Sequence, residues 1–310
     1  MADYGIPYQG SKDKIVHKLT AILPKAENFY DLFGGGFSVS HFMLAHKKYK
    51  NIHYNELEPT TVQLIRDAIN GKYNYNVFKP KWITREQFDA NKKTCGYTRI
   101  VWSFGNSQKN YIFGKEIEGD KKSLHQVVVF DEWDDNAVKI LGVKSLPKNL
   151  SIRGRRLAVR QLITMRGERG DLQQLERLER LQQLERLQQL EQLERLQRLQ
   201  QLERLERLQR LEMTSLSYDQ VPINPNSIIY CDPPYAGTAG YVSEFDHGKF
   251  WQWVRDSKHP IFISEYSAPK DMKTVMAIRH KKTNSQTCTD SVEKLFCNQI
   301  GAQLLANSAE

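Results

Sequence analysis

Leucine recurs at every third position from Leu172 to Leu211, and the positions between hold only Gln, Glu and Arg. These residues favour helix, and the segment contains neither Gly nor Pro, so we predict a helix over 172–211. A step of three residues rotates by about 300°, so the leucines drift around the helix instead of lining one face. A left-handed coiled coil requires a repeat near 3.5 residues, which this segment lacks. We expect a long, partly packed helix, with self-association or contact with a partner as the alternative roles.

The net charge of +9 lies outside this repeat, since residues 172–212 hold eight Arg and eight Glu. The positive residues are densest just before the repeat, in residues 148–170. Such a cluster suits DNA phosphates, and Arg also reads guanine, although a solvated basic face is the alternative. The candidate DNA-contacting residues are Lys109, Arg153, Arg155, Arg156 and Arg160.

The composition also limits the cellular setting. No apolar run approaches the roughly 20 residues that span a bilayer, and the N-terminus lacks the apolar core of a signal peptide. The four cysteines do not have the spacing of metal ligands, and scattered thiols fit a reducing cytoplasm. We therefore expect a cytoplasmic protein without membrane contact and without a metal site.

Strand and helix patterns alternate on both sides of a large insertion. Strands predicted over 28–33 and 51–57 are each followed by a helix, over 38–49 and 59–73. This alternation is typical of a parallel α/β sheet. After the repeat it resumes with "NSIIYCDPPY", a helix over 247–257 and a strand over 260–266.

The insertion is rich in aromatic residues. Trp102, Phe104, Tyr111 and Phe113 alternate with polar residues, and Lys109 lies among them. Aromatic rings beside cations are typical of a nucleic-acid surface, and a small aromatic core is the alternative.

Two features at the ends of the first strands indicate a ligand. The glycines of "YDLFGGGFSVS" lie between a strand and a helix, where ligands bind in open α/β sheets and where Gly lets them approach the backbone. Glu56, near the end of the second strand, suits ribose hydroxyls, with a surface carboxylate as the alternative. Together they suggest an adenosyl ligand.

The stretch "IIYCDPPYAGT" ends a third strand in a rigid turn. Neither proline can donate a ladder hydrogen bond, so the strand stops there. Asp232 and the carbonyl of Pro233 are acceptors that could hold an exocyclic amino group, and Tyr235 could stack on the base that carries it. Enzymes that act on bases turned out of DNA need such a pocket.

Four motifs in this order resemble the Dam-like DNA adenine-N6 methyltransferases of the alpha group, many of them carried by phages. They are "IPYQGSKDKI" (6–15), "DLFGGGFS" (31–38), "YNELEP" (54–59) and "CDPPY" (231–235). The resemblance implies a Rossmann-like, S-adenosylmethionine-dependent methyltransferase sheet, double-stranded DNA as partner, and a bacterial or phage-infected host, with restriction-modification as a setting. It also implies a discontinuous catalytic domain (1–73 and 213–310) and a target-recognition insertion (74–170), and the helical repeat (171–212) lies outside the family's core as a third part.

The resemblance assigns roles by position. The implied catalytic residues are Asp232, Pro233, Pro234 and Tyr235. The implied cofactor-binding residues are Tyr8, Gly10, Lys12, Asp31, Phe33, Gly34, Gly36, Glu56 and Asp232. The implied reaction is direct methyl transfer to the N6 amino group of a flipped adenine. The alternatives are methylation of cytosine N4, RNA or a protein glutamine, or a catalytically inactive DNA-binding module.

Overall fold

The computed structural model describes residues 4–168, 186–202, 210–235, 245–281 and 290–307, and its chain divides into two units. The sheet unit comprises Met1–Ile6, Gly10–Ile65 and Gln201–Glu310. The helical unit comprises Pro7–Gln9 and Arg66–Gln200. Within the described ranges, no helix is long and apolar enough to cross a membrane.

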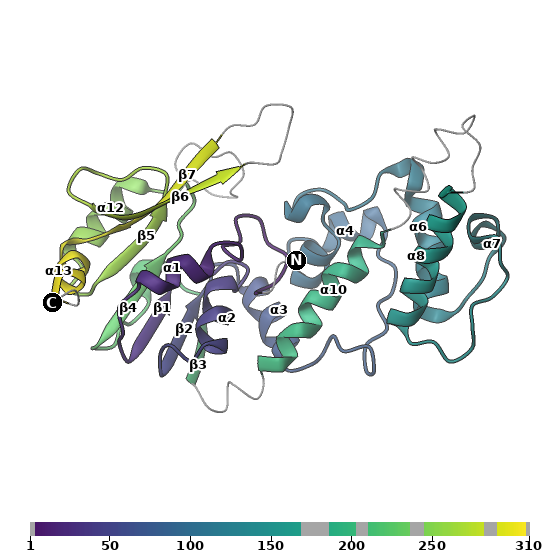
Figure 1. The fold of residues 1–310 in the computed structure, drawn as a ribbon, viewed down its shortest axis with the longest axis horizontal. Helices are drawn as coiled ribbons and strands as arrows, with labels where there is room; N and C mark the ends of the chain where they lie inside the picture. The colour runs from purple at the N-terminus through teal and green to yellow at the C-terminus, as the bar shows by residue number, and fades with distance from the viewer. Residues whose placement is uncertain (1–3, 169–185, 203–209, 236–244, 282–289, 308–310) are drawn as a thin grey trace. The chain divides into compact units, whose positions relative to one another are not determined.

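The sheet unit is built on seven strands, which are β1 (Asn28–Asp31), β2 (Asn51–Asn55), β3 (Arg210–Thr214), β4 (Ser227–Cys231), β5 (Ile261–Glu265), β6 (Lys273–Lys281) and β7 (Asp290–Cys297). Their order is β3-β2-β1-β4-β5-β7-β6 (Figure 1). The first five strands pair in parallel, whereas β7 runs antiparallel to β5 and β6. β1, β4 and β5 are buried along their whole length, as expected of central parallel strands. The predicted Rossmann-like α/β fold is confirmed, and its strand order reverses between β1 and β4.

Helices of the sheet unit pack on both faces of the sheet. They are α1 (Val16–Ile22), α2 (Ser38–Ala45), α3 (Pro59–Ile69, which continues into the helical unit), α12 (His247–Asp256) and α13 (Gln299–Asn307). Successive residues of a strand point to opposite faces. Tyr30 of β1 packs into a core with Phe250 and Val254 of α12, whereas the next residue, Asp31, accepts a hydrogen bond from Ser40 of α2. Asp31 therefore lies under α2, on the face opposite α12.

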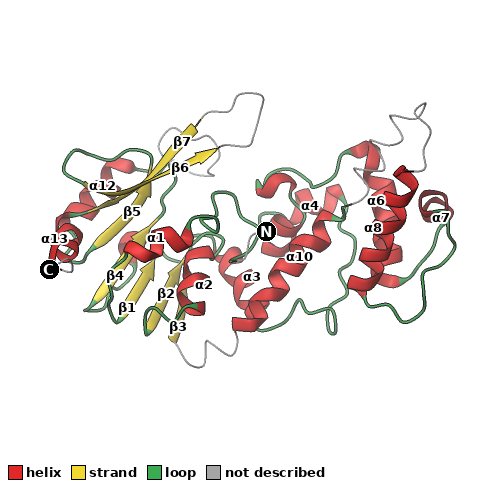
Figure 2. Cartoon of the chain, in the orientation of Figure 1, coloured by secondary structure: helices red, strands yellow, loops and turns green. Residues whose placement is uncertain are grey.

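The helical unit consists, in its described part, mainly of helices and loops (Figure 2). The helices are α4 (Arg85–Asn91), α5 (Gly96–Val101), α6 (Lys115–Phe130), α7 (Asp135–Leu141), α8 (Ile152–Glu168) and α10 (Gln188–Arg198), with 3-10 turns at Phe104–Asn106 and Leu199–Leu202.

Most of the aromatic residues of the insertion form a core in this unit. Trp82 stacks on Phe113 with ring centroids 5.5 Å apart and meets Trp102 edge-on at 5.1 Å. Trp102, Tyr111 and Phe113 are buried, so the aromatic-core alternative holds for them. Phe104 differs, since 60% of it is exposed.

The leucine repeat enters the core of the helical unit through α10. Leu187, Leu190, Leu193, Leu196 and Leu199 are each at most 2% exposed, although their direction drifts around the helix. Leucines that point in different directions can all be buried because different parts of the helical unit surround α10 along its length. The first two leucines pack with α6, α7 and α8, and further along Gln197 donates to the carbonyl of Tyr73.

The helix predicted over 172–211 is confirmed over α10 and wrong at its end. Arg210 and Leu211 begin the edge strand β3 and pair with Asn51 and Ile52 of β2. Ladder hydrogen bonds to a strand distant in the sequence outweigh local helix propensity there. Residues 172–185 and 203–209 of the predicted helix lie outside the described residues.

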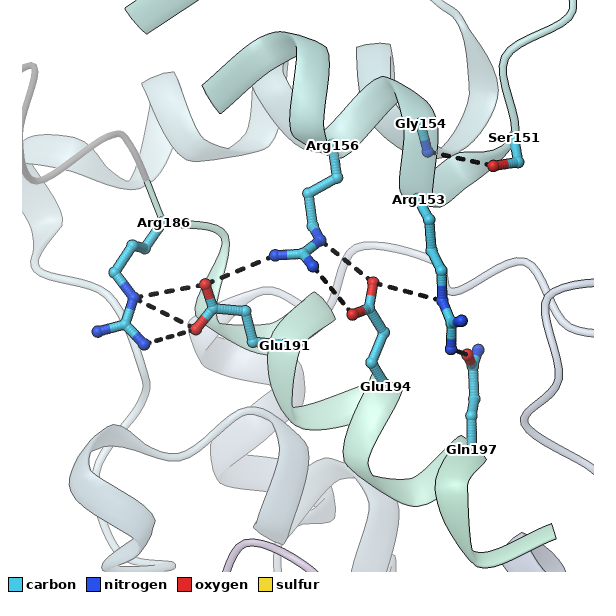
Figure 3. A network of polar contacts seen from close by, with 8 residues as sticks. All are labelled: Ser151, Arg153, Gly154, Arg156, Arg186, Glu191, Glu194 and Gln197. Atoms are coloured by element: carbon cyan, nitrogen blue, oxygen red, sulfur yellow. Dashed lines mark hydrogen bonds and ion pairs between the residues drawn. The ribbon is translucent and has the colours of Figure 1, made fainter. Parts of the chain in front are cut away.

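The charged residues between the leucines bind α10 to α8 (Figure 3). Arg156 of α8 reaches two glutamates of α10, with nitrogen–oxygen distances of 2.9 Å to Glu194 and 3.6 Å to Glu191. Glu191 also pairs with Arg186 at 2.6 Å, and Arg153 donates to Gln197 at 3.1 Å. The repeat thus supplies both leucines for the core and carboxylates for the basic helix before it.

The register of α10 is set by a buried glutamine. His125 is fully buried, which lowers its pKa to about 4 and keeps the imidazole neutral. Its Nε2 lies 2.9 Å from the carbonyl of Pro80 and must donate to it, so Nδ1 accepts from the Gln189 amide at 3.3 Å. One turn on, the Gln192 amide, with its nitrogen toward α5, donates to the carbonyls of Ile100 and Val101.

These two glutamines identify one place in a nearly uniform repeat. Each triplet begins with Leu, and its third residue is Gln or Arg. Within 172–210, Gln189 and Gln192 are the one case in which two successive triplets both have Gln as the third residue. Every other Gln at a third position has Arg at the third position of each neighbouring triplet. A slip by one triplet in either direction would bring Arg186 or Arg195 into one of these two sites. The buried amide partners therefore select one register.

We expect Gln189→Arg to lower the free energy of unfolding by roughly 2–3 kcal/mol, because it buries a charge without a partner. Gln188→Arg, one position away at a half-buried site, is the matched control and should change it by less than about 1 kcal/mol. Urea unfolding followed by circular dichroism measures both. Equal stabilities would contradict this account of the register.

Candidate active site

Asp232 follows the last residue of β4, where the strand order reverses and ligands bind in open α/β sheets. Its side chain is 18% exposed, and its Oδ2 lies 2.6 Å from Nζ of Lys12, whose own side chain is 7% exposed. Burial raises the pKa of Asp232 to about 6, against the opposing effect of the Lys12 ammonium. The other oxygen, Oδ1, is enclosed and accepts no hydrogen bond within the described part of the chain.

Glu293 of β7 joins this pair and was not predicted from the sequence. Its Oε1 lies 3.3 Å from Nζ of Lys12 and accepts a hydrogen bond from the Tyr235 hydroxyl at 2.7 Å. The Lys12 ammonium also lies over the Tyr235 ring, 5.0 Å from its centroid. Burial alone would lower the pKa of Lys12, but the carboxylates of Asp232 and Glu293 raise it, so the lysine stays charged. One ammonium is thus shared between two carboxylates.

Asp31 is a second buried acid in the same region, at the end of β1. The residue is fully buried, Ser40 donates to its Oδ2 at 2.7 Å, and Oδ1 has no hydrogen-bond partner in the described structure. Burial raises the pKa of Asp31 to about 7. Its place beneath α2 gives it a structural contact, and its predicted role toward the cofactor stays a prediction.

The Gly-rich turn and Glu56 are joined directly. The Gly35 amide donates to Oε2 of Glu56 at 2.9 Å, and the Glu58 amide donates to Oε1 at 3.1 Å. A Cβ on Gly34 would lie 2.1 Å from the ring of Tyr54, so only Gly fits there. Gly35 has a φ of 45°, in the left-handed region. The sheet therefore places a fixed carboxylate beside a backbone turn.

Three other predicted cofactor residues, Phe33, Gly10 and Gly36, belong to the sheet unit. Phe33 stacks on Tyr218 with ring centroids 5.3 Å apart. Gly10 has a φ of 79° and its carbonyl accepts from Lys12 Nζ at 3.2 Å. Gly36 accepts from the Ile6 amide at 2.8 Å. Tyr8 belongs to the helical unit, so its cofactor contact stays a prediction.

The turn after β4 has the predicted form. Pro233 is buried and Pro234 half-buried, and β4 ends directly before them at Cys231. The Tyr235 ring meets Tyr266 edge-on, with centroids 4.8 Å apart. Tyr235 is therefore held by a ring, a carboxylate and a cation.

The predicted DNA-contacting residues differ in their surroundings. Arg155 donates to the carbonyls of Val128 (2.7 Å), Val129 (3.0 Å) and Leu150 (2.8 Å), and Arg156 pairs with α10 as described above. Arg153 is 56% exposed despite its contacts with α10, and Lys109 and Arg160 are exposed. Arg155 and Arg156 thus have structural contacts inside the helical unit. DNA contact by the five predicted residues stays a prediction.

No cluster of three or more His, Cys, Asp and Glu side chains suited to a metal occurs in the ranges that the structure describes. The two acids with raised pKa, the lysine and the tyrosine are groups that can bind a polar organic group.

In a comparison with known protein families, residues 8–127 match the model of the D12 class N6 adenine-specific DNA methyltransferases. The matched segment contains Lys12, the Gly-rich turn and Glu56, and ends before Asp232. No curated protein matches the chain. The match indicates an adenine-specific DNA methyltransferase and agrees with the resemblance to Dam-like enzymes.

We expect Asp31→Asn to alter how stability depends on pH. The unfolded carboxyl titrates near 3.8 and the folded one at about 7, so between these values the folded state holds the extra proton and wild-type stability falls as pH rises. Asn does not titrate, so from about pH 5 to 8 the stability difference should shift in favour of the variant by roughly 2–3 kcal/mol.

Thermal and urea unfolding at several pH values measure this difference. Asp89→Asn, which replaces an exposed aspartate of α4, is the matched control. A difference between Asp31→Asn and wild type that does not vary with pH would contradict a raised pKa of Asp31.

Proposed function

We propose that this adenine-specific DNA methyltransferase takes its methyl group from S-adenosylmethionine and transfers it to the N6 amino group of an adenine turned out of double-stranded DNA. The observation that carries the proposal is the enclosed oxygen Oδ1 of Asp232, which accepts no hydrogen bond from the described residues. Buried polar atoms normally have a partner, and an amino group donated by the substrate would supply it.

The chemistry follows from what Asp232 and its turn can accept. Asp232 Oδ1 and the Pro233 carbonyl accept the two N6 hydrogens, which opposes delocalisation of the nitrogen lone pair into the ring. S-adenosylmethionine supplies a methyl group on a sulfonium, and the amine displaces the thioether as the carbon–nitrogen bond forms. The product amine loses a proton, for which Asp232, with a pKa of about 6, is an acceptor. Most of the acceleration comes from holding the reacting groups in line.

Several residues of the sheet unit fit the cofactor. The Lys12 ammonium complements the carboxylate of its methionine part. Each oxygen of Glu56 already accepts one backbone amide and can accept a second hydrogen bond, here from a ribose hydroxyl. Phe33, half-buried beside the Gly-rich turn, supplies an apolar wall for the adenine ring.

The helical unit supplies a surface for DNA. Phe104 begins a tight turn in which Gly105, Asn106 and Gln108 have positive φ, and its amide donates to the carbonyl of Asn110 at 2.9 Å. An aromatic ring held on so short a turn, with Lys109 beside it, suits stacking on bases and pairing with a phosphate. This turn is our candidate for contact with the disturbed base stack.

Incubation with S-adenosylmethionine that carries a labelled methyl group and with unmethylated genomic DNA tests the reaction. We expect label in N6-methyladenine after digestion to nucleosides, and none with Asp232→Ala, whose fold is checked by circular dichroism. Label in N4-methylcytosine would replace the proposed base. An absence of label with bound cofactor would favour RNA as substrate or an inactive DNA-binding module. Wild-type turnover by Asp232→Ala would overturn the mechanism.

We expect Lys109→Ala to weaken binding to DNA and to reduce the slope of log affinity against log salt by about one, because one phosphate contact is lost. Lys144→Ala, which removes an exposed lysine elsewhere in the helical unit, is the matched control. Fluorescence anisotropy at several salt concentrations measures both. An unchanged slope for Lys109→Ala would remove this residue from the DNA surface.

A further inference from the structure

Glu293 reaches the active site from a strand that runs against the others. β7 pairs antiparallel with β5, and Lys294 lies opposite Glu265, the last residue of β5. Glu293 therefore lies one residue beyond the carboxyl end of β5, at the edge of the sheet where β4 ends and Asp232 begins. Its side chain is 13% exposed.

One oxygen of Glu293 contacts both Tyr235 and the lysine that pairs with Asp232. Oε1 accepts from the Tyr235 hydroxyl at 2.7 Å and lies 3.3 Å from Lys12 Nζ. The same ammonium lies 2.6 Å from Asp232 Oδ2. Lys12 is thus bound more closely to Asp232, with Glu293 as a second carboxylate within reach.

We propose that Glu293 is a positioning residue, which receives Lys12 when Asp232 binds the adenine amino group and which fixes the ring of Tyr235. This inference rests on the proposed methyl transfer. A lysine ammonium and the amino group of a base compete as donors for the same carboxylate. Without a second carboxylate of the chain, movement of Lys12 away from Asp232 would leave its buried ammonium with the Gly10 carbonyl but with no ionised partner from the protein, which is costly. Glu293 removes that cost, because the ammonium passes from one carboxylate to the other over a short distance.

The hydroxyl contact gives Glu293 a second role. Tyr235 lies three residues after Asp232, and its ring is the surface proposed to meet the target base. A hydrogen bond at the far end of the ring restricts rotation about the side-chain torsions. Glu293 therefore sets the direction of the ring as well as the position of the lysine.

The charges around Asp232 give the inference a measurable signature. Burial raises the pKa of Asp232, Lys12 lowers it, Glu293 raises it, and the Tyr235 hydroxyl lowers it. Asp31 of β1 and both Tyr230 and Cys231 of β4 are further titratable groups whose charges interact with that of Asp232. Asp232 must be ionised to accept the amine, so activity is lost as pH falls through its pKa. Removal of the Glu293 charge lowers that pKa, which moves the loss of activity to lower pH.

We expect Glu293→Gln to lower kcat by roughly tenfold, through the loss of a charge-assisted contact. The acid limb of the profile of kcat/KM against pH should move down by about 1 unit or less. Glu293→Asp keeps the charge but shortens the side chain, so it should lower kcat and leave the acid limb near its wild-type position. Glu27→Gln is the matched control. Glu27 lies just before β1, at the amino-terminal end of the strand and away from Asp232, and it pairs with Lys50.

A titration of the Asp232 carboxyl by carbon-13 NMR separates this inference from the proposed function, because it needs no turnover. A lower pKa of Asp232 in Glu293→Gln supports the inference, whether or not the wild type transfers label. An unchanged Asp232 titration in Glu293→Gln would overturn it, as would a loss of kcat equal at every pH. If Glu293→Gln does not fold, the test uses Glu293→Asp instead, and a wild-type kcat in that variant would overturn the inference. Absence of label transfer by the wild type would overturn the proposed function alone.

Discussion

The parallel pairing of β1 with β4 is the constraint on which the structure depends. Asn28 lies opposite Ser227 and Asp31 opposite Tyr230, although residues Arg66–Gln200 of the helical unit separate the two strands in sequence. Closing so long a loop costs entropy, which a folded insertion limits when its two ends meet. They do meet, since Asn74 near the beginning of the helical unit donates to Gln200 at its end, at 2.9 Å. Strand order reverses at this pairing, so the Gly-rich turn and Asp232 follow the carboxyl ends of two neighbouring strands, where ligands bind in open α/β sheets.

Local patterns were sufficient to predict the central strands but not their partners. The strand predicted over 260–266 is β5 (Ile261–Glu265), and the helix predicted over 247–257 is α12 (His247–Asp256), because apolar runs and periodicity are local properties. The helix prediction was wrong at the end of the repeat, because Arg210 and Leu211 form a strand through their pairing with β2. Glu293 was missed for a related reason. Its place beside Asp232 follows from the antiparallel direction of β7, which the sequence "VEKLFCN" does not indicate.

The site concentrates charge that is costly to bury. Asp31 and Asp232 both have raised pKa values because the sheet removes water from them, and Lys12 offsets part of this cost by pairing with Asp232. Buried groups with shifted pKa values are concentrated at functional sites. The fold supplies the rigid strands that hold the two acids, whereas the lysine comes from the segment before α1 and has a long, adjustable side chain.

The glutamine pair at 189 and 192 has a consequence for how the gene can change. Each leucine triplet corresponds to nine nucleotides, and tandem units of that kind gain or lose copies during replication. A copy added on either side of 187–202 keeps the reading frame and leaves the buried amides with their partners. The number of triplets can therefore change while α10 keeps these contacts. Related genes could differ in the amount of chain between α8 and β3 and still form the same core.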